Sequence, residues 1–439
     1  MQKYKIITYG CQMNVHESEK AAGILKTLGY EPCLDEADAD LLLFNTCCIR
    51  DNAEKRAIGN IGAAKKYKKA NRNLIIAVMG CMTQQEKAGE SLRSRLPFVD
   101  IVIGTNNLDK LGEYITQFTE ARKPVIAIDD NENPAINENL PIYRTSGTNA
   151  WINIMYGCNN FCTYCIVPYV RGRERSRQPA DVIDEFKAML DAGYKEITLL
   201  GQNVNSYGND IGLKHGFVDL LEKLASFSGD HRIRFMTSHP KDFSRDLIDV
   251  IAGSKNICNN IHLPVQSGSD KILKLMNRHY TRADYLDIID QIRAKIPDCG
   301  ITSDIMVGFP YEEEADFLDT LDLVERVKYS GAFTFVYSVR KGTPAAAMPQ
   351  IDPLIAKDRI MRLVALQNKI TKEVSKTYEG RTCRVLCEDM APKHDNLVCG
   401  RTDCGRMVTF SGNIGDIGKF FDVEIESSKS ASLFGKVIN

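Results

Sequence analysis

Long apolar runs are absent from this sequence. The longest, such as LIIAVMG at 74–80, fall far short of the roughly 18 residues that cross a bilayer, so no transmembrane segment is expected. The first residues, MQKYKIITYG, lack the basic start and the apolar stretch of a secretion signal. These two absences predict a cytoplasmic protein that does not enter a membrane.

An excess of one charge is also absent, because the formal net charge is only -1. A nucleic-acid partner would therefore need basic residues that are concentrated in patches. Cysteine is too scarce for a disulfide scaffold, at 14 of 439 residues, but it is abundant for an intracellular enzyme. In a reducing compartment such cysteines more often bind metal or carry chemistry.

The length of 439 residues exceeds a single core of about 100 to 200 residues, so three domains are expected. Residues 4–103 alternate short apolar runs with longer helix-forming stretches, which predicts an amino-terminal α/β domain with a parallel sheet over 1–125. Residues 126–143 are rich in Asn, Asp and Pro and are typical of a linker.

The strand and helix pattern begins again in the expected second domain, residues 144–376. Six strand-like runs with helical patterns between them predict a (βα)6 partial TIM barrel; the runs are 151–157, 196–202, 233–238, 260–266, 300–310 and 332–338. Residues 377–439 consist of short strand-like runs broken by Gly and Asp, which predicts a small terminal β-barrel.

A close group of three cysteines begins the second domain. Cys158, Cys162 and Cys165 form a C-x3-C-x2-C array in GCNNFCTYC, and no fourth cysteine follows locally. Three thiolates leave one iron of a 4Fe-4S cluster open. An open iron can chelate S-adenosylmethionine, and an electron passed to its sulfonium produces a 5′-deoxyadenosyl radical. The alternative is a zinc loop or buried free thiols, although zinc usually takes four ligands.

A second group of cysteines is dispersed through the first domain. Cys11, Cys47 and Cys81 each follow a predicted parallel strand, and they are separated by 36 and 34 residues, about one βα unit each. Ligands of open α/β sheets collect outside these strand ends, so a second cluster is a hypothesis. The alternative is chance, because small thiols suit buried positions.

The C-x3-C-x2-C array at the start of a βα barrel resembles the radical S-adenosylmethionine (radical SAM) superfamily. With GCQMN, NTC-x-[IV]-R, GC-x-x-Q and a terminal β domain, nearly the whole chain resembles the methylthiotransferase family. The resemblance implies two 4Fe-4S clusters, of which the auxiliary one is held by Cys11, Cys47 and Cys81 and supplies sulfur. Cys48 is an additional neighbour of Cys47. Tyr164 would lie near the adenine of S-adenosylmethionine, unless it only packs.

Three segments are most similar to the branch of the family that modifies N6-isopentenyladenosine beside the tRNA anticodon: FMTSHP at 235–240, HLPVQSGSD at 262–270 and FTFVYSVRKGTPAA at 333–346. One departure is GFPYEE at 308–313, where the family usually has GFPGET. The resemblance implies that one S-adenosylmethionine methylates a cluster sulfur and a second generates the radical that activates the adenine C2–H. The alternative substrates are threonylcarbamoyladenosine and a ribosomal-protein aspartate. A non-catalytic iron–sulfur carrier or RNA-binding protein is a further alternative.

Arginines at 171, 173, 175 and 177 alternate after the cluster loop, and an extended segment would place them on one face. We expect Arg171, Arg173 and Arg175 to contact tRNA phosphate or the S-adenosylmethionine carboxylate, with pairing to Glu174 and Asp181 as the alternative. Cofactor contacts are also expected from polar residues at predicted strand ends, which otherwise cap helices or anchor loops; they are Gln202, Ser238, Gln266 and Asp304.

The last domain resembles the TRAM module, a small OB-like barrel that binds RNA, here the anticodon stem-loop of tRNA. It contains four cysteines whose spacing is poor for a zinc site, namely Cys383, Cys387, Cys399 and Cys404. The run KKYKK at 65–69 is expected to be a solvated helix face, with tRNA contact as the alternative. We also expect that an external donor such as a flavodoxin or ferredoxin supplies electrons, and that the protein is a monomer.

Overall fold

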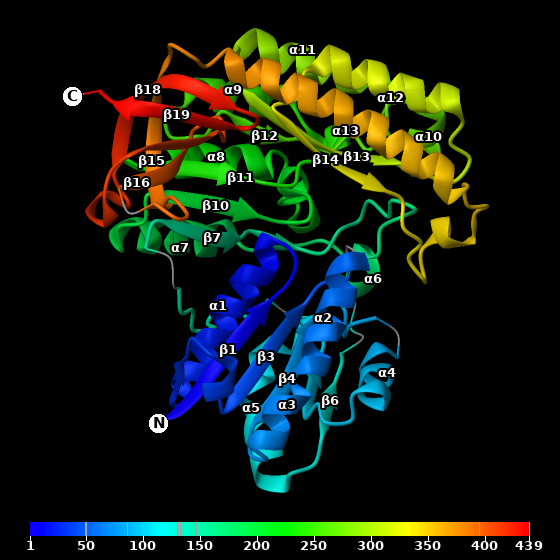
Figure 1. Ribbon diagram of the computed structural model, residues 1–439, viewed down its shortest axis with the longest axis vertical. Helices are drawn as coiled ribbons and strands as arrows, with labels where there is room; N and C mark the ends of the chain where they lie inside the picture. The colour runs from blue at the N-terminus through cyan, green and yellow to red at the C-terminus, as the bar shows by residue number, and fades with distance from the viewer. Residues whose placement is uncertain are drawn as a thin grey trace. The chain divides into compact units, whose positions relative to one another are not determined.

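The computed structural model describes residues 1–48, 51–85, 87–129, 131, 134, 136–144, 147–394 and 396–438. Its contacts divide the chain into two compact units (Figure 1). The first unit contains residues 1–145, 156–159 and 165–175, and the second contains 146–155, 160–164 and 176–439. Of the linker expected at 126–143, residues 130, 132, 133 and 135 lie outside the described residues.

The first unit is built on a parallel sheet with strand order β2-β1-β3-β4-β5-β6. Its central strands β3 and β4 are buried along their whole length, as in parallel sheets that are covered on both faces. The strands are β1 Gln2–Thr8, β2 Tyr30–Pro32, β3 Leu41–Thr46, β4 Ile75–Gly80, β5 Ile101–Ile103 and β6 Val125–Ala127.

Helices cover both faces of this sheet and produce two apolar cores. Helices α1 and α5 contribute Leu25 and Ile115 to one core, while α2, α4 and α6 contribute Ile61, Leu92 and Val170 to the other. The helices are α1 Gln12–Thr27, α2 Asp51–Ala63, α3 Lys65–Ala70, α4 Ala88–Arg95, α5 Leu111–Ala121 and α6 Val167–Arg171, with 3-10 turns at Glu36–Asp38 and Thr105–Lys110.

The second unit begins with six parallel strands in two sheets, ordered β11-β10-β7 and β12-β13-β14. A parallel bridge between Ile233 and Ile257 joins β11 to the segment that leads into β12. The expected six-stranded partial barrel is therefore confirmed. The strands are β7 Asn149–Asn153, β10 Glu196–Leu200, β11 Arg232–Phe235, β12 Asn260–His262, β13 Gly300–Val307 and β14 Gly331–Val336.

The helices of the second unit pack an apolar core against these strands, to which α7 contributes Phe186, α8 Leu221 and α11 Ile292. Among them, α13 runs from the last strand of the partial barrel to the terminal domain (Figure 1). The helices are α7 Pro179–Asp191, α8 Gly216–Ala225, α9 Arg245–Gly253, α10 Asp270–Leu275, α11 Arg282–Lys295, α12 Glu314–Val327 and α13 Pro353–Lys376. Short strands β8 Met155–Tyr156 and β9 Arg175–Ser176 pair with each other.

The terminal domain is a closed barrel with strand order β15-β16-β17-β19-β18, which confirms the predicted small β-barrel. It rests against the amino-terminal ends of the preceding strands. Arg232, the first residue of β11, donates to the carbonyl oxygens of Arg401 and Arg384 at 2.6 and 2.7 Å. The strands are β15 Thr382–Met390, β16 Leu397–Thr402, β17 Met407–Ser411, β18 Phe420–Lys429 and β19 Ser432–Val437.

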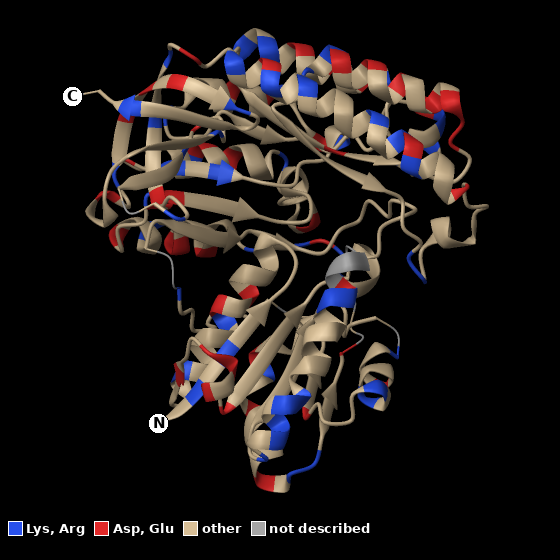
Figure 2. Cartoon of the chain, in the orientation of Figure 1, with Lys and Arg blue, Asp and Glu red and all other residues tan. Residues whose placement is uncertain are grey.

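Charged residues of both signs occur along helices α11, α12 and α13 (Figure 2). Helix α3 is more basic, because Lys65, Lys66 and Lys69 are exposed on it. Its fourth lysine, Lys68, is instead half-buried and pairs with Asp100 at 2.6 Å. In the described part of the chain, none of the helices is both long and apolar enough to cross a bilayer.

Candidate cluster and cofactor sites

The first cysteine set lies at one edge of the amino-terminal sheet. Strands β1, β3 and β4 are parallel neighbours, so their carboxyl ends lie side by side. Cys11 occupies the position that begins α1, Cys47 directly follows β3, and Cys81 directly follows β4. The structure thus brings together three thiols that are far apart in the sequence.

Glycines before two of these cysteines permit this close approach. Gly10 has φ +113, and a Cβ placed on it would stand 2.6 Å from the Cβ of Cys47 and 3.0 Å from its sulfur. Gly80 has φ +108, and a Cβ there would lie 2.3 Å from the carbonyl oxygen of Thr46. A side chain at either position would push the strand ends apart, which explains the Gly-Cys pairs in GCQMN and GC-x-x-Q.

A buried polar group links these thiols. The Cys11 thiol donates to Oδ1 of Asn14 at 3.7 Å, and the same oxygen accepts a hydrogen bond from Arg171 at 3.1 Å. Arg171 also donates from Nε to the sulfur of Cys81 at 3.2 Å, and it forms two hydrogen bonds with Glu17 at 2.6 and 3.2 Å. A guanidinium therefore lies directly against this cysteine set.

The environment favours a thiolate at Cys81. A hydrogen bond from Cys48 lowers the pKa of the Cys81 thiol, and the charge of Arg171 lowers it further. Burial instead raises the pKa of the Cys11 thiol, although Arg171 opposes that rise. Because thiolates are the metal-binding form of cysteine, three converging thiols beside a cation fit a 4Fe-4S cluster.

The loop that carries Cys158, Cys162 and Cys165 is held by backbone contacts rather than by regular structure. Within the second unit, Asn277 donates to the carbonyl oxygens of Asn160 and Phe161 at 3.2 and 3.1 Å. Within the first unit, the amide of Cys158 donates to the carbonyl of Gly172 at 3.2 Å. These hydrogen bonds to the backbone anchor the loop on both sides of Cys162.

Cys162 is almost fully buried, and its sulfur accepts a hydrogen bond at 3.4 Å from Nη1 of Arg278. The neighbouring Tyr164 packs edge-on to Phe309, with 6.5 Å between ring centroids. It is half-buried beside Ile272 and Met276, so part of its ring remains accessible. The contact of Tyr164 with an adenine stays a prediction.

Four expected cofactor contacts come from neighbouring strands. Gln202 and Ser238 follow β10 and β11, and the amide of Ser238 donates to the carbonyl of His262 at 3.3 Å. Gln266 follows β12, and its amide donates to the carbonyl of Asp304 at 2.9 Å. Asp304 differs from the expectation, because it lies inside β13 and not at its end. Its carboxylate is 3.7 Å from Nε2 of His262.

Several buried polar atoms at these strand ends have no hydrogen-bond partner among the described residues. They are the hydroxyl of Ser238, Oδ1 of Asn203, Nδ2 of Asn205 and Nε2 of His239. Buried polar groups are normally satisfied, so these atoms fit a polar ligand such as S-adenosylmethionine. Asn203, Asn205 and His239 were not expected from the sequence, although they lie within three residues of Gln202 or Ser238, in GQNVN and TSHP.

The arginines after the cluster loop do not share one face, because α6 continues to Arg171 and only Arg175 and Ser176 form the extended β9. Arg171 is 5% exposed, whereas Arg173 is exposed. Arg175 donates to the carbonyls of Pro134 and Arg171 at 3.1 and 3.2 Å. Arg177 is buried and pairs with Glu185 at 2.6 Å.

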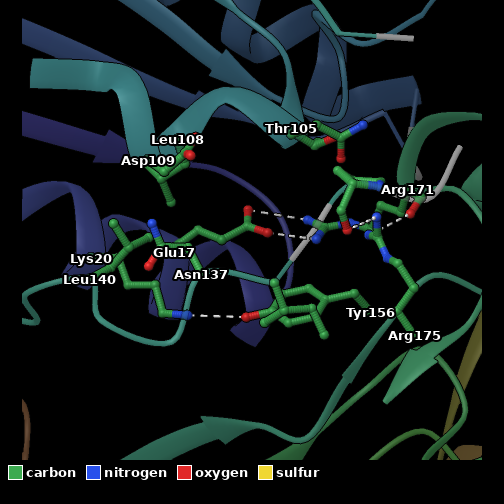
Figure 3. A pocket seen from close by; sticks show the side chains of 13 residues that line it. Glu17, Lys20, Thr105, Leu108, Asp109, Asn137, Leu140, Tyr156, Arg171 and Arg175 are labelled. Atoms are coloured by element: carbon green, nitrogen blue, oxygen red, sulfur yellow. Dashed lines mark hydrogen bonds and ion pairs between the residues drawn. The ribbon is translucent and has the colours of Figure 1, made fainter. Parts of the chain in front are cut away.

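A pocket of about 90 Å³ adjoins Arg171 in the first unit (Figure 3). Glu17, Lys20 and Tyr156 line it, and the ammonium of Lys20 donates to the Tyr156 hydroxyl at 3.0 Å. Sites for small organic ligands usually measure about 300 Å³ or more. This pocket is therefore too small for S-adenosylmethionine.

The terminal cysteines are not grouped as zinc ligands. Cys387 and Cys404 pack in the apolar core of the barrel, and Cys383 and Cys399 are partly exposed. Among the residues that the structure describes, no three Cys, His, Asp or Glu side chains lie close enough together to hold a single ion. A four-iron cluster spreads its ligands more widely, so this finding concerns mononuclear sites only.

Three known families match consecutive parts of the chain. Residues 3–104 match the Uncharacterized protein family UPF0004, residues 152–324 match the Radical SAM superfamily, and residues 376–438 match the TRAM domain. The order agrees with the sheet, the partial barrel and the closed barrel described above.

Solved structures of low identity share the fold. The radical S-adenosylmethionine methyltransferase TsrM from Kitasatospora setae has a TM-score of 0.57 at 12% identity, over 91% of this chain and 78% of that one. The cobalamin-dependent S-adenosylmethionine radical enzyme OxsB has a TM-score of 0.51 at 11% identity, over 84% and 56%.

Curated relatives are much more similar. A tRNA-2-methylthio-N(6)-dimethylallyladenosine synthase from Clostridium tetani is 50% identical over 434 residues, which cover 99% of this chain and 96% of the relative. A protein of the same name from Thermoanaerobacter pseudethanolicus is 50% identical over 437 residues, covering 99% and 92%. The chain belongs to the radical SAM family of the tRNA-2-methylthio-N(6)-dimethylallyladenosine synthases.

Proposed function

We propose that this chain is a radical SAM tRNA methylthiotransferase that converts N6-isopentenyladenosine, next to the anticodon, into its 2-methylthio derivative. The observation that carries the proposal is the meeting of Cys11, Cys47 and Cys81 at one sheet edge, in a chain that also has the C-x3-C-x2-C loop. The names of relatives at 50% identity support the choice of nucleoside.

When bound, two 4Fe-4S clusters and S-adenosylmethionine supply the electron, the radical chemistry and the sulfur that an inert adenine C–H requires. Cys158, Cys162 and Cys165 hold the cluster that binds S-adenosylmethionine, and the other three thiols hold the auxiliary cluster. The strand-end residues orient S-adenosylmethionine through polar contacts, with Tyr164 beside its adenine; they are Gln202, Ser238, Gln266 and Asp304.

The anticodon stem-loop of tRNA is the macromolecular partner in this proposal. The terminal barrel binds its backbone, and the exposed Arg173 contributes a phosphate contact. Arg175 supports the same segment through its two backbone hydrogen bonds. Electrons come from an external donor such as a flavodoxin or ferredoxin, and the protein acts as a cytoplasmic monomer.

Mass spectrometry of tRNA nucleosides from a deletion strain tests this function. We expect N6-isopentenyladenosine to accumulate without its 2-methylthio derivative, and the wild-type gene, but not Cys162→Ala, to restore the product. A methylthio group missing from threonylcarbamoyladenosine or from a ribosomal-protein aspartate would instead identify one of the alternative substrates.

Iron and sulfide analysis of anaerobically reconstituted protein tests the two clusters. Two cubanes require about eight irons per chain, and replacing either cysteine set with alanine should halve that number. If Cys11, Cys47 and Cys81 were all replaced and the iron content stayed complete, there would be no auxiliary cluster at this sheet edge.

A further inference from the structure

Each cysteine set has a buried arginine in contact with one of its sulfurs. Arg171 donates to Cys81 at 3.2 Å, and Arg278 donates to Cys162 at 3.4 Å. The two arginines are 5% and 4% exposed. Because arginine stays protonated in proteins, each set has a permanent cation and an N–H···S hydrogen bond.

The charge of Arg171 is offset by a carboxylate. Glu17 lies opposite its guanidinium and accepts two hydrogen bonds, as Figure 3 shows. Glu17 is itself 7% exposed, so the pair is buried as a unit. The pair carries no net charge, so Glu17 opposes the electrostatic effect of Arg171 on Cys81, while the hydrogen bond from Arg171 to the sulfur remains.

The charge of Arg278 is not offset in this way. Its remaining hydrogen bonds go to the carbonyl of Pro264 at 2.7 Å and to the hydroxyl of Tyr280 at 3.0 Å. In the described part of the chain, neither Asp nor Glu forms an ion pair with it. A buried charge without an opposite charge is costly, so a negative charge beside this cation would stabilise it. The thiolates of a bound cluster provide one.

These two environments should affect the reduction of a cluster differently. Reduction adds one negative charge, which a nearby cation and hydrogen bonds to sulfur both stabilise, and the reduction potential therefore rises. An uncompensated cation acts over a longer distance than a neutral ion pair, because the fields of the paired charges largely cancel. The Arg278 site should consequently experience the larger effect.

We propose that Arg278 and Arg171 are positioning residues that raise the reduction potentials of the two clusters, with the larger contribution from Arg278 because Glu17 offsets the charge of Arg171. This inference rests on the proposed function, since that function assigns a cluster to each cysteine set. The two arginines then have different roles. Arg278 sets the reduction potential of the cluster that reduces S-adenosylmethionine, whereas Arg171 mainly orients Cys81.

Single-cluster proteins allow each potential to be measured alone. With Cys11, Cys47 and Cys81 replaced by alanine, a redox titration followed by electron paramagnetic resonance reports the central cluster only. We expect Arg278→Met to shift its midpoint to a lower potential and Arg278→Lys, which keeps the charge, to restore most of that shift. Arg282→Met is the matched control, because Arg282 pairs with Asp319 and Asp322 on the surface and should leave the midpoint unchanged.

The complementary protein, with Cys158, Cys162 and Cys165 replaced by alanine, reports the auxiliary cluster. Here Glu17→Gln should raise the midpoint, because it exposes the charge of Arg171 to the cluster. The double variant Glu17→Gln with Arg171→Met should return it close to the starting value, since both charges are then absent.

Iron content separates the possible failures. If the parent single-cluster proteins hold no iron, the cluster assignment of the proposed function is wrong. If they hold iron and Arg278→Met has an unchanged midpoint, the inference about Arg278 is wrong. If Arg278→Met does not assemble a cluster, the midpoint of Arg278→Gln is measured in its place. Equal midpoints for Arg278→Gln and Arg278→Lys would then overturn the role of the charge.

Discussion

Tyr311 has a backbone conformation that glycine adopts more easily. Its φ is +64, in the turn GFPYEE where the methylthiotransferase resemblance has glycine. The turn nevertheless closes normally, because Glu312 accepts hydrogen bonds from the amide of Gly308 at 2.7 Å and from Arg359 at 2.8 Å. The tyrosine therefore introduces local strain without changing the turn, and its side chain is half exposed.

We predict that Tyr311→Gly raises the free energy of unfolding by roughly 0.5 to 1 kcal/mol. A left-handed conformation costs a non-glycine residue roughly 1 to 2 kcal/mol, and part of this gain is lost to the greater freedom of glycine in the unfolded chain. Chemical denaturation measures the change. Tyr311→Ala keeps the strain and should show no gain; an equal gain would point to the exposed ring instead.

Adjacent cysteines make distinct contacts at the auxiliary site. Cys47 stands against Gly10, next to Cys11, while the thiol of Cys48 donates to Cys81. We predict that Cys47→Ala loses the auxiliary cluster, about half of the iron, and that Cys48→Ala keeps both clusters. Iron and sulfide per chain after anaerobic reconstitution give the answer. The two variants are matched controls, since both side chains are buried, and the reverse result would make Cys48 the ligand.

Residues whose role follows from their spacing along the chain could be predicted from the sequence. Residues whose role depends on tertiary contacts could not. The cysteines follow strands at regular intervals, so their meeting follows from parallel topology alone. The partners of Arg171 come from α1 and from the end of β4, more than one βα unit apart. No local pattern indicates that contact, and the alternation of arginines suggested an exposed face instead.

Strand β11 connects the partial barrel to the terminal barrel through Arg232. This side chain is 5% exposed, and its guanidinium lies 5.1 Å from the ring centroid of Phe420 while it donates to two carbonyl oxygens. We predict that Arg232→Met lowers the stability of the terminal barrel by about 2 kcal/mol, because two partly buried carbonyls lose a charged donor. Denaturation or limited proteolysis measures the loss.

The control for this prediction is Arg384→Met. Arg384 forms an exposed ion pair with Asp230, and such pairs contribute about 0 to 1 kcal/mol. Equal destabilisation by both variants would mean that general loss of positive charge, and not the buried contact of Arg232, weakens the domain.

Long strands were predicted well, and short or interrupted strands were not. The apolar runs of β3, β4 and β13 agree with the structure, whereas β2 and β6, with three residues each, add edge strands that no run indicated. The run at 260–266 predicted a longer strand than β12, which ends at His262. Gln266, at φ +72, makes only an isolated bridge to Ile305, because a left-handed residue interrupts regular strand pairing.

In the second unit, the terminal barrel and the polar strand-end residues lie at opposite ends of the parallel strands. The barrel contacts Arg232 and Asn260 at the amino ends, whereas Ser238 and Gln266 follow the carboxyl ends. The eight residues of β13 extend roughly 26 Å, at about 3.3 Å per residue. The proposed S-adenosylmethionine site at the carboxyl ends is therefore remote from the terminal barrel.

Removal of residues 377–439 should consequently weaken tRNA binding and leave the cleavage of S-adenosylmethionine intact. Filter binding or fluorescence anisotropy measures the affinity, and release of 5′-deoxyadenosine under a strong reductant measures the cleavage. The affinity of the complete chain should fall as salt rises, because phosphate contacts release counterions. Unchanged tRNA affinity after truncation would contradict an RNA-binding role for this domain.

Removal of each cysteine set should abolish a different step of the reaction. Cys11, Cys47 and Cys81, with Asn14, Glu17 and Arg171 around them, belong to the first unit, whereas the proposed S-adenosylmethionine contacts Gln202, Ser238, Gln266 and Asp304 belong to the second. Loss of these thiols should therefore leave S-adenosylmethionine binding intact. The variant with all three replaced by alanine should still release 5′-deoxyadenosine under reduction but form no methylthio product, since it lacks the sulfur source.

Replacement of Cys158, Cys162 and Cys165 should instead abolish the cleavage of S-adenosylmethionine. Without an open iron to chelate S-adenosylmethionine, no 5′-deoxyadenosine should form. Transfer of a methyl group to a sulfur of the auxiliary cluster needs no electron, because it is a displacement at the sulfonium methyl, so S-adenosylhomocysteine should still appear. Chromatography of both nucleosides beside the tRNA product gives all three readouts, and iron analysis verifies the remaining cluster. A methylthio product from the protein that lacks Cys11, Cys47 and Cys81, with its central cluster intact, would require another source of sulfur.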